Sequence, residues 1–322
     1  MKRALVLFAI GGALAAPAFG DQNTEVLAWL QRVAAAAQRL NYTGTFTYQS
    51  GRASETSRIT HLVDASGEME KLEVLDGSPR EVVRYNDEVK CYLPEEKIVI
   101  IEKRGRNKAF PALLPSSVAK LGEHYQIRQG DTTRVAGFDS QLVILEPKDN
   151  LRYGHRLWAD INTGLILKAL TVNERNETIE QFVFNQIQID GVLGRDALKP
   201  KFDTEGKDWR IHNARSAQSL SAGGEWLFKT QLPGFVRSAG MRRQSSRGNG
   251  PETTHFIFTD GLASISVFIE PLSDRYDEKE TYSVGAINVY KRVAGKHLLT
   301  VLGDVPMATL ARLANGMELR KK

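Results

Sequence analysis

The sequence of 322 residues has only one cysteine, Cys91. A single cysteine excludes an internal disulfide, so the stability of the chain must come from packed cores. Cys91 lies on the apolar side of the alternating run Val89–Leu93. A buried strand residue is the favoured interpretation, and a reactive thiol is the alternative.

Recognisable catalytic patterns are also missing. The sequence has no nucleophile elbow, no paired-histidine zinc motif and no P-loop. Its six histidines are scattered, so a zinc site would have to be assembled from distant strands. Gly248-Asn249-Gly250 lacks the rest of a dinucleotide fingerprint and is typical of a turn. We therefore expect no catalytic residues, no metal and no cofactor, although a site assembled in space needs no sequence motif.

Long apolar runs are absent after the first twenty residues. Met1-Lys2-Arg3 is positively charged, Ala4–Ala16 is apolar, and Ala18 and Gly20 are small residues at the two positions that a signal peptidase reads. This pattern predicts a signal peptide over residues 1–20, because the apolar run is shorter than the roughly 20 residues that span a bilayer. We expect cleavage after Gly20 and export to the periplasm, where nucleic acid is not a partner.

Charge is unevenly distributed along the remaining chain. Residues 21–195 hold 22 basic and 24 acidic residues, whereas residues 196–322 hold 19 and 14. The C-terminal part is therefore the better candidate for binding an anionic partner.

Residues 21–195 combine one helix with many strands. Apolar residues recur on one face of Thr24–Leu40, which predicts a helix whose alanines, at 34–37, pack closely against a sheet. Period-two segments then follow at regular spacing with turn residues between them, which indicates a large antiparallel meander. The expected strands are 42–49, 57–64, 68–75, 81–85, 89–93, 97–102, 124–129, 132–135, 139–146, 154–160, 165–173 and 177–190.

The last of these strands is apolar on both faces. Simple alternation places Ile179, Val183, Ile187 and Ile189 on one face and the two phenylalanines of Phe182–Phe184 on the other. A sheet with one wet face would alternate more cleanly. Two interpretations stay open: a curled sheet that covers a helix or a cavity, or ordinary burial on both faces.

Residues 196–224 are predicted to be a linker, since they are polar and lose the periodic pattern. A second patterned region covers 225–322 and ends in a helix that begins at Pro306. The predicted fold class is α+β and mostly antiparallel β. It comprises a large N-terminal antiparallel sheet with a helix and a smaller C-terminal antiparallel sheet with a helix.

Two surfaces are candidates for binding. A half-open N-terminal sheet lined by aromatic residues could hold acyl chains, although a plain packed core explains the same residues. These lipid-cavity candidates are Trp29, Phe46, Tyr48, Trp158, Phe182 and Phe184. The second surface is a basic loop whose guanidinium groups suit phosphate or carboxylate, although a solvated loop is the alternative. Its candidate partner-binding residues are Arg242, Arg243 and Arg247.

Several long blocks resemble one protein family, MucB/RseB. The hallmark block is His255–Glu270, flanked by Leu232-Pro233-Gly234-Phe235 and by Thr300–Pro306. In the N-terminal half, Tyr42–Phe46 and Leu157–Leu165 are similar to family blocks as well. The resemblance covers essentially the whole chain after residue 20.

The resemblance implies a periplasmic negative regulator of an envelope-stress sigma factor, in an alginate or sigma-E type response. Such proteins bind the periplasmic part of a transmembrane anti-sigma factor of the MucA/RseA type and shield it from site-1 proteolysis. Lipopolysaccharide or lipoprotein acyl chains are the implied releasing ligands. It also implies a LolA/LolB-like, lipid-sensing N-terminal domain that forms a half-open β-barrel around a helix, and an anti-sigma-binding C-terminal domain.

Two other functions remain as alternatives. The N-terminal half by itself would suit a periplasmic lipid or lipoprotein carrier of the LolA/LolB type, but a simple carrier has no need of a second, basic domain. An enzyme is disfavoured by the missing motifs. The sequence leaves open whether copies of the chain form a homo-oligomer.

Overall fold

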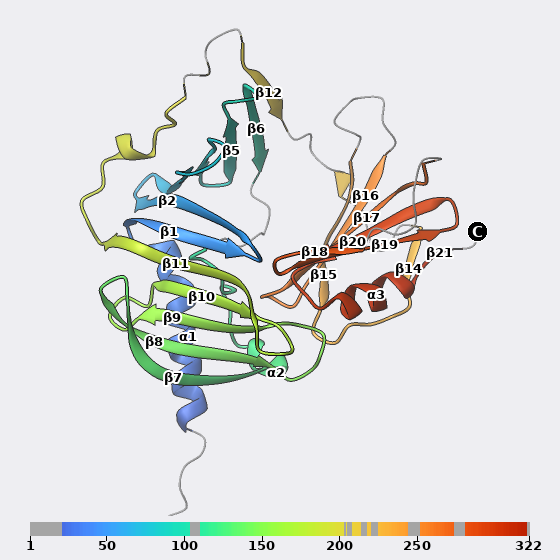
Figure 1. Cartoon of the computed structure of the whole chain (residues 1–322), viewed down its shortest axis with the longest axis horizontal. Coiled ribbons are helices and arrows are strands. Elements are labelled where there is room, and N and C mark those ends of the chain that lie inside the picture. Colours follow the sequence, from blue (N-terminus) through green and yellow to red (C-terminus); the bar gives the residue numbers. More distant parts are fainter. Residues whose placement is uncertain are drawn as a thin grey trace, which may run out of the picture.

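The computed structural model describes residues 21–103, 110–202, 204, 208–213, 218–219, 225–243, 252–273 and 281–320. In these residues the chain forms a twelve-stranded sheet, a seven-stranded sheet and a two-stranded sheet. The two large sheets come from the N-terminal and the C-terminal parts of the chain and lie beside each other (Figure 1). The fold class expected from the sequence is therefore confirmed.

The twelve-stranded sheet curls around the long helix α1 (Asp21–Arg39), as Figure 1 shows. Its order is β12-β6-β5-β4-β3-β2-β1-β11-β10-β9-β8-β7, so the sheet has two ends, β12 and β7. Its strands are β1 (Tyr42–Ser50), β2 (Ala53–Asp64), β3 (Gly67–Val74), β4 (Glu81–Tyr85), β5 (Glu88–Leu93), β6 (Ile98–Lys103), β7 (Tyr125–Val135), β8 (Phe138–Pro147), β9 (Gly154–Asp160), β10 (Ile166–Val172), β11 (Thr178–Ile189) and β12 (Arg210–Asn213).

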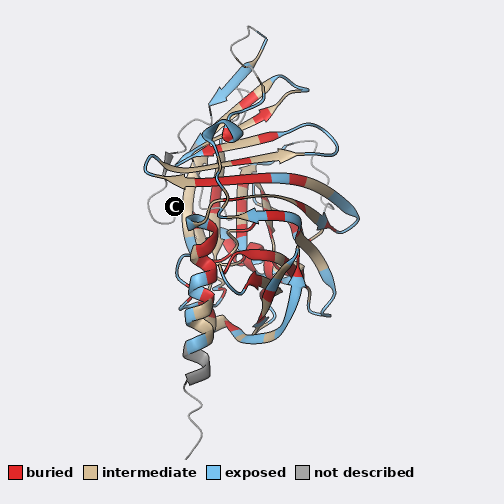
Figure 2. Ribbon diagram, turned by 90° about the vertical axis from the view of Figure 1, so that its left-hand side faces the viewer, coloured by how far each residue is buried: buried red, intermediate tan, exposed pale blue. Residues whose placement is uncertain are grey.

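Helix α1 is held against this sheet by small and branched residues. Leu30 and Val33 are buried together with three alanines, Ala34, Ala36 and Ala37, as the alanine run predicted. Small side chains allow a helix axis to approach a sheet closely, so the core stays dense without bulky residues on the helix. Figure 2 shows the buried residues of α1 where it meets the sheet.

Among the described residues, no helix is long and apolar enough to cross a membrane.

Part of the expected linker joins the twelve-stranded sheet. Strand β12 pairs with β6 in parallel, from Arg210 opposite Ile98 to Asn213 opposite Ile101. The 3-10 helix η1 (Arg195–Leu198) precedes it, and the rings of Phe202 and Trp209 lie 6.2 Å apart. The aromatic residues of this segment are therefore in contact with each other, and the sheet has one parallel edge that the meander pattern did not predict.

Strand β11 contains a β-bulge that explains its apolar character on both faces. Thr45 of β1 pairs with Gln186, but the next residue, Phe46, pairs with Phe184, so Asn185 is an extra residue. A bulge of this kind reverses which side chains face inward beyond it.

The expected alternation along β11 is therefore wrong. Residues 42, 44, 46 and 48 of β1 share one face, and their partners are Ile189, Ile187, Phe184 and Phe182. Directly paired residues lie on the same face of an antiparallel sheet, so all four partners face the concave side. The concave face is thus apolar from Phe182 to Ile189.

The seven-stranded sheet has the order β13-β15-β16-β17-β20-β19-β18, and helix α3 (Met307–Asn315) packs against β19 and β20. Its strands are β13 (Gln218–Ser219), β15 (Val236–Arg243), β16 (Thr253–Thr259), β17 (Ser264–Pro271), β18 (Tyr282–Val284), β19 (Ile287–Ala294) and β20 (His297–Gly303). The two-stranded sheet pairs β14 (Trp226–Phe228) with β21 (Met317–Leu319). Pro306 is the N-cap of α3, one residue earlier than its expected place inside the helix.

Cys91 lies on β5 opposite Val82 and is half-buried rather than fully buried. Burial raises the pKa of its thiol above the ordinary value. A raised pKa disfavours the thiolate, which is the reactive form.

Candidate functional site

Five aromatic side chains cluster on the concave face of the N-terminal sheet. The ring of Phe110 stacks on Phe182, with centroids 5.1 Å apart, and lies 5.0 Å from Phe184. Phe46 is within 5.2 Å of Phe110, and Tyr48 stacks on Phe182 at 4.5 Å. Strands β1 and β11 carry four of these rings, and the segment between β6 and α2 (Leu121–His124) supplies the fifth.

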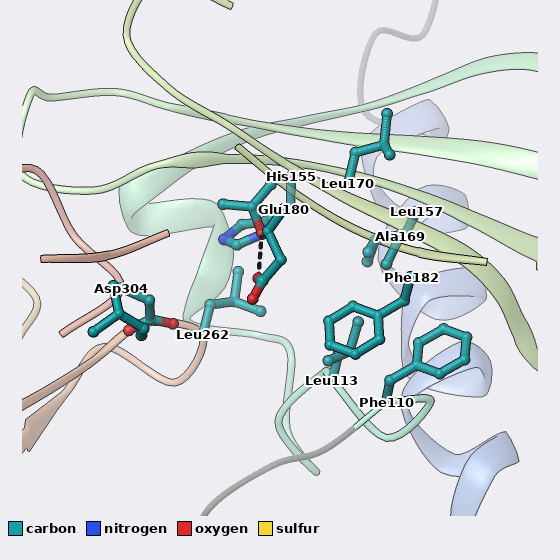
Figure 3. A pocket seen from close by; sticks show the side chains of 12 residues that line it. Phe110, Leu113, His155, Leu157, Ala169, Leu170, Glu180, Phe182, Leu262 and Asp304 are labelled. Atoms are coloured by element: carbon teal, nitrogen blue, oxygen red, sulfur yellow. Dashed lines mark hydrogen bonds between the residues drawn. The ribbon is translucent and has the colours of Figure 1, made fainter. Parts of the chain in front are cut away.

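A cavity of about 200 Å³ extends from this cluster to the junction with the C-terminal sheet. Figure 3 shows Phe110, Leu113 and Phe182 at one end and Asp304 with Leu262 at the other. Residues of both sheets therefore line it. The lining residues are Phe110, Leu113, His155, Leu157, Ala169, Leu170, Thr171, Glu180, Phe182, Leu262, Ile287 and Asp304.

The polar end of the cavity is dominated by two carboxylates. Glu180 of β11 accepts hydrogen bonds from the Tyr48 hydroxyl at 2.8 Å and from the Thr171 hydroxyl at 3.2 Å. Asp304 accepts a hydrogen bond from the backbone N–H of Ser264 at 2.6 Å. Burial raises the pKa of Asp304 to about 6, with Glu180 and Asp260 adding to the effect because they are also negative.

This raised pKa makes a prediction for stability. The folded protein keeps the Asp304 proton up to about pH 6, whereas the unfolded chain loses it near pH 4, so the folded state binds more protons in between. Stability should therefore fall as the pH rises from 4 to 6, by about 3 kcal/mol for this group. Comparing urea unfolding of wild type and Asp304→Asn at several pH values isolates its contribution. A difference that does not change between pH 4 and 7 contradicts the assignment.

A buried arginine joins the two sheets beside the cavity. Arg152, in the loop between β8 and β9, donates a hydrogen bond to the carbonyl of Pro233 at 2.5 Å. Its guanidinium lies 3.5 Å from the Asp260 carboxylate, and both side chains are fully buried. The same guanidinium lies over the ring of Phe235, 4.9 Å from the centroid. The Arg152 guanidinium therefore contacts a carbonyl, a carboxylate and an aromatic ring of the C-terminal part.

The neighbours of Arg152 extend this junction. Leu151 belongs to the core of the C-terminal sheet, and its carbonyl accepts a hydrogen bond from Thr309 at 3.0 Å. The Tyr153 hydroxyl accepts a hydrogen bond from the Asn288 amide at 2.8 Å. On the other side, the Tyr125 hydroxyl donates to Asp260 at 3.1 Å. The β8–β9 loop of the N-terminal sheet thus supplies Leu151 to the C-terminal core and hydrogen-bonds to that part of the chain.

The comparison with known proteins identifies the family. Residues 25–202 match the MucB/RseB N-terminal domain, and residues 221–318 match the MucB/RseB C-terminal domain. The chain belongs to the MucB/RseB family. The chain is 30% identical to the sigma factor AlgU regulatory protein MucB of Pseudomonas aeruginosa, over 98% of this chain and 96% of that protein. It is 23% identical to the sigma-E factor regulatory protein RseB of Escherichia coli, over 90% of each chain.

Solved structures agree with this assignment. A crystal structure of MucB in complex with MucA(peri) superposes with a TM-score of 0.71 at 27% identity, covering 92% of this chain and 99% of that one. The complex structure of Pseudomonas aeruginosa MucA/MucB superposes with a TM-score of 0.73 at 26% identity, covering 92% and 100%. The similarity therefore includes both sheets and their connection.

Two of the MucB/RseB blocks recognised in the sequence meet at the junction. Asp260 belongs to the hallmark block and contacts Arg152, while Pro233 and Phe235 of the flanking block contact the same guanidinium. Gly234 lies so close to His124 that a β-carbon there would be 2.5 Å from the imidazole. These residues therefore connect the two sheets to each other.

The lipid-cavity candidates separate into two groups. Phe46, Tyr48, Phe182 and Phe184 form the cluster, and Phe182 lines the cavity. Trp29 lies on α1, half-buried, with the Arg32 guanidinium 4.1 Å from its ring centroid.

Trp158, the sixth lipid-cavity candidate, does not face the cavity. It alternates on β9 with Leu157, which lines the cavity, so its ring is carried by the opposite face. There the Lys168 ammonium lies 4.7 Å from the ring centroid.

The basic-loop candidates are only partly within the described residues. Arg242 is half-buried on β15 and lies 4.0 Å from the Glu252 carboxylate. Arg243 ends β15, where its backbone pairs with Thr253, and Arg247 lies outside the described residues.

Several cavity residues escaped the sequence-based search. Phe110 lies in an apolar, proline-containing loop rather than a strand, so periodicity did not select it. Glu180 and Asp304 are isolated carboxylates whose proximity depends on how the sheets are joined. The apolar run Phe110–Leu114 was the only signal available for the loop. In the part of the chain that the structure describes, no group of three or more His, Cys, Asp or Glu could hold a metal ion.

Proposed function

We propose that this chain is a periplasmic, non-enzymatic regulator that binds the periplasmic domain of a transmembrane anti-sigma factor of the MucA/RseA type. Binding shields the anti-sigma factor from site-1 proteolysis and so represses the envelope-stress sigma factor. One observation carries the proposal: nearly the whole chain superposes on a MucB that was solved in complex with MucA(peri). Residues 1–20 act as a cleaved signal peptide in this proposal, which delivers the chain to the periplasm.

The two sheets are proposed to have different roles, lipid sensing and partner binding. Residues 21–195 sense lipid, residues 196–224 connect, and residues 225–322 contribute the anti-sigma contact with a surplus of basic residues. Acyl chains of lipopolysaccharide or lipoprotein enter the aromatic cavity and release the partner. Release requires that the ligand bind the free form more tightly than the partner-bound form. A cavity lined by both sheets supports this coupling, because an occupant would touch both.

A carrier of the LolA/LolB type is the second candidate, since the concave, aromatic face of the N-terminal sheet suits an acyl chain. The β8–β9 loop weighs against it. A simple carrier would not need a second sheet whose core includes Leu151 of the first.

The proposal is tested with the mature chain and a purified periplasmic anti-sigma domain. Isothermal titration calorimetry should give saturable one-to-one binding, and the bound domain should resist a site-1 type protease that cleaves it when free. Added lipid should reverse both effects. Absence of binding removes the regulator proposal, whereas binding that lipid does not reverse removes only the release step.

The basic loop makes a separate prediction. Replacing Arg242, Arg243 and Arg247 together by alanine should weaken partner or lipopolysaccharide binding about tenfold at low salt, through slower association. The loss should shrink as ionic strength rises, because exposed charges are screened over about 10 Å at 0.1 M salt. The matched control replaces Arg128, Arg134 and Arg175, three exposed arginines of the N-terminal sheet. Equal affinities for the two triple variants at low salt exclude a role for the loop.

A further inference from the structure

The polar end of the cavity is acidic on both sides of the junction. Glu180 comes from β11 of the N-terminal sheet, and Asp304 follows β20 of the C-terminal sheet. No lysine or arginine lines the cavity. Among the described residues, neither carboxylate forms an ion pair with a lysine or arginine, although the chain has 43 such residues. The charge at this end therefore comes from two carboxylates without a lysine or arginine beside them, and the imidazole of His155 is the basic side chain in the lining.

Glu180 is held in place but keeps capacity to accept more hydrogen bonds. The Tyr48 hydroxyl donates to its Oε1, and the Thr171 hydroxyl donates to its Oε2. A carboxylate offers about four lone-pair sites, so one site on each oxygen remains for another donor. Figure 3 shows Glu180 between His155 and the aromatic end, where a ligand in the cavity would pass it.

The other end of the cavity is apolar and narrow. Phe110 and Phe182 stack with an interplanar angle of 9°, and Leu157 and Ala169 complete the wall. A volume of about 200 Å³ is below the roughly 300–1,000 Å³ that drug-sized ligands occupy. The cavity suits one apolar chain or the end of a longer one.

We propose that this cavity binds an amphiphile with a primary ammonium head, its chain among the phenylalanines and its ammonium between Glu180 and Asp304. An ammonium carries three donors and one compact positive charge, which fits two carboxylates that have no lysine or arginine partner among the described residues. A phosphate or carboxylate head would meet like charge in a partly buried site, where repulsion is stronger than in water. This proposal rests on the proposed function only in that a lipid is the signal. It adds that the lipid carries a primary ammonium as its head group.

Binding is tested without any anti-sigma domain, using the mature chain and ten-carbon probes below their micelle concentrations. Calorimetry at pH 7.5 should show decylammonium binding at least tenfold more tightly than decanoate, with decanol in between. A preference of less than twofold, or a preference for decanoate, overturns the proposal. Because the partner is absent, a failed anti-sigma titration and a failed amphiphile titration remain separate results.

Variants locate the head group. Glu180→Gln should weaken decylammonium at least fivefold and leave decanol within twofold, and Asp304→Asn should act in the same direction. The matched control is Glu174→Gln, an exposed carboxylate in the turn before β11, which should change neither probe. Ala169→Leu fills the apolar wall and should abolish binding of all three probes, with circular dichroism confirming the fold. Decylammonium binding that survives both carboxylate variants unchanged refutes the site.

Two sources could supply such a head, and two more probes distinguish them. Lysophosphatidylethanolamine carries its ammonium beside a phosphate, whereas the amide of S-decyl-cysteine carries an ammonium without a nearby anion. Tighter binding of the cysteine derivative identifies an acylated peptide as the source, and tighter binding of the lysolipid identifies a phospholipid. Failure of both to bind contradicts the proposal.

Discussion

Replacing Arg152 by methionine is expected to lower the free energy of unfolding by about 3–5 kcal/mol. Methionine retains much of the side-chain length but leaves the buried Asp260 carboxylate without its cation. It also removes the hydrogen bond to the Pro233 carbonyl and the contact with the Phe235 ring. Urea unfolding of wild type and variant measures the difference, with tryptophan fluorescence as the probe.

The matched control is Arg175→Met, since Arg175 is 78% exposed in a turn and should cost less than about 0.5 kcal/mol. A second comparison adds Asp260→Asn to the Arg152 variant. Removing the stranded charge should restore part of the loss, with a coupling of about 0.5–3 kcal/mol between the two residues. Strictly additive losses would show that Arg152 and Asp260 do not act as a pair.

Replacing Phe184 by alanine is expected to cost about 3–5 kcal/mol of stability. The ring is 2% exposed and contacts Phe46 and Phe110, with centroids 5.8 and 5.0 Å away. Its removal leaves a space that the rigid sheet cannot close, so transfer and cavity costs add. Thermal and urea unfolding of the mature chain should both show the loss.

Two further variants serve as controls for the expected loss of stability in Phe184→Ala. Phe184→Leu keeps most of the volume and should cost less than about 1.5 kcal/mol. Val192→Ala, at a fully exposed valine beyond the same strand, should change stability by less than about 0.5 kcal/mol. If Phe184→Ala is as stable as Val192→Ala, then the concave face is not a packed core at this position.

Strand β11 illustrates where sequence reasoning stops. Its length and apolar character were predictable, because period-two patterns report burial from neighbouring residues alone. Its bulge at Asn185 was not, since a bulge is defined by the register with β1, more than 130 residues earlier in the sequence. One extra residue moved Ile187 and Ile189 to the face of Phe182. The sheet curls around α1, which agrees with the interpretation of a curled sheet that covers a helix.

The candidate site shows the same division. Four of the six aromatic candidates form one cluster, and Phe182 also lines the cavity. The fifth ring of the cluster, Phe110, comes from a loop without periodicity. Trp158 was selected by residue type, but alternation on β9 carries it to the other face.

The sequence by itself determined the strand-rich α+β class, the long first helix and the family, because these depend on local periodicity and on residue blocks read in order. Only the tertiary structure decided what those blocks do at the junction. Asp260, Pro233 and Phe235 acquire a shared partner in Arg152, which lies about 80 to 110 positions earlier. Glu180 and Asp304, which are also far apart in the sequence, line one cavity because the two sheets meet there. Such pairings arise because the β8–β9 loop of one sheet packs into the core of the other, and no local pattern encodes which distant side chains that loop contacts.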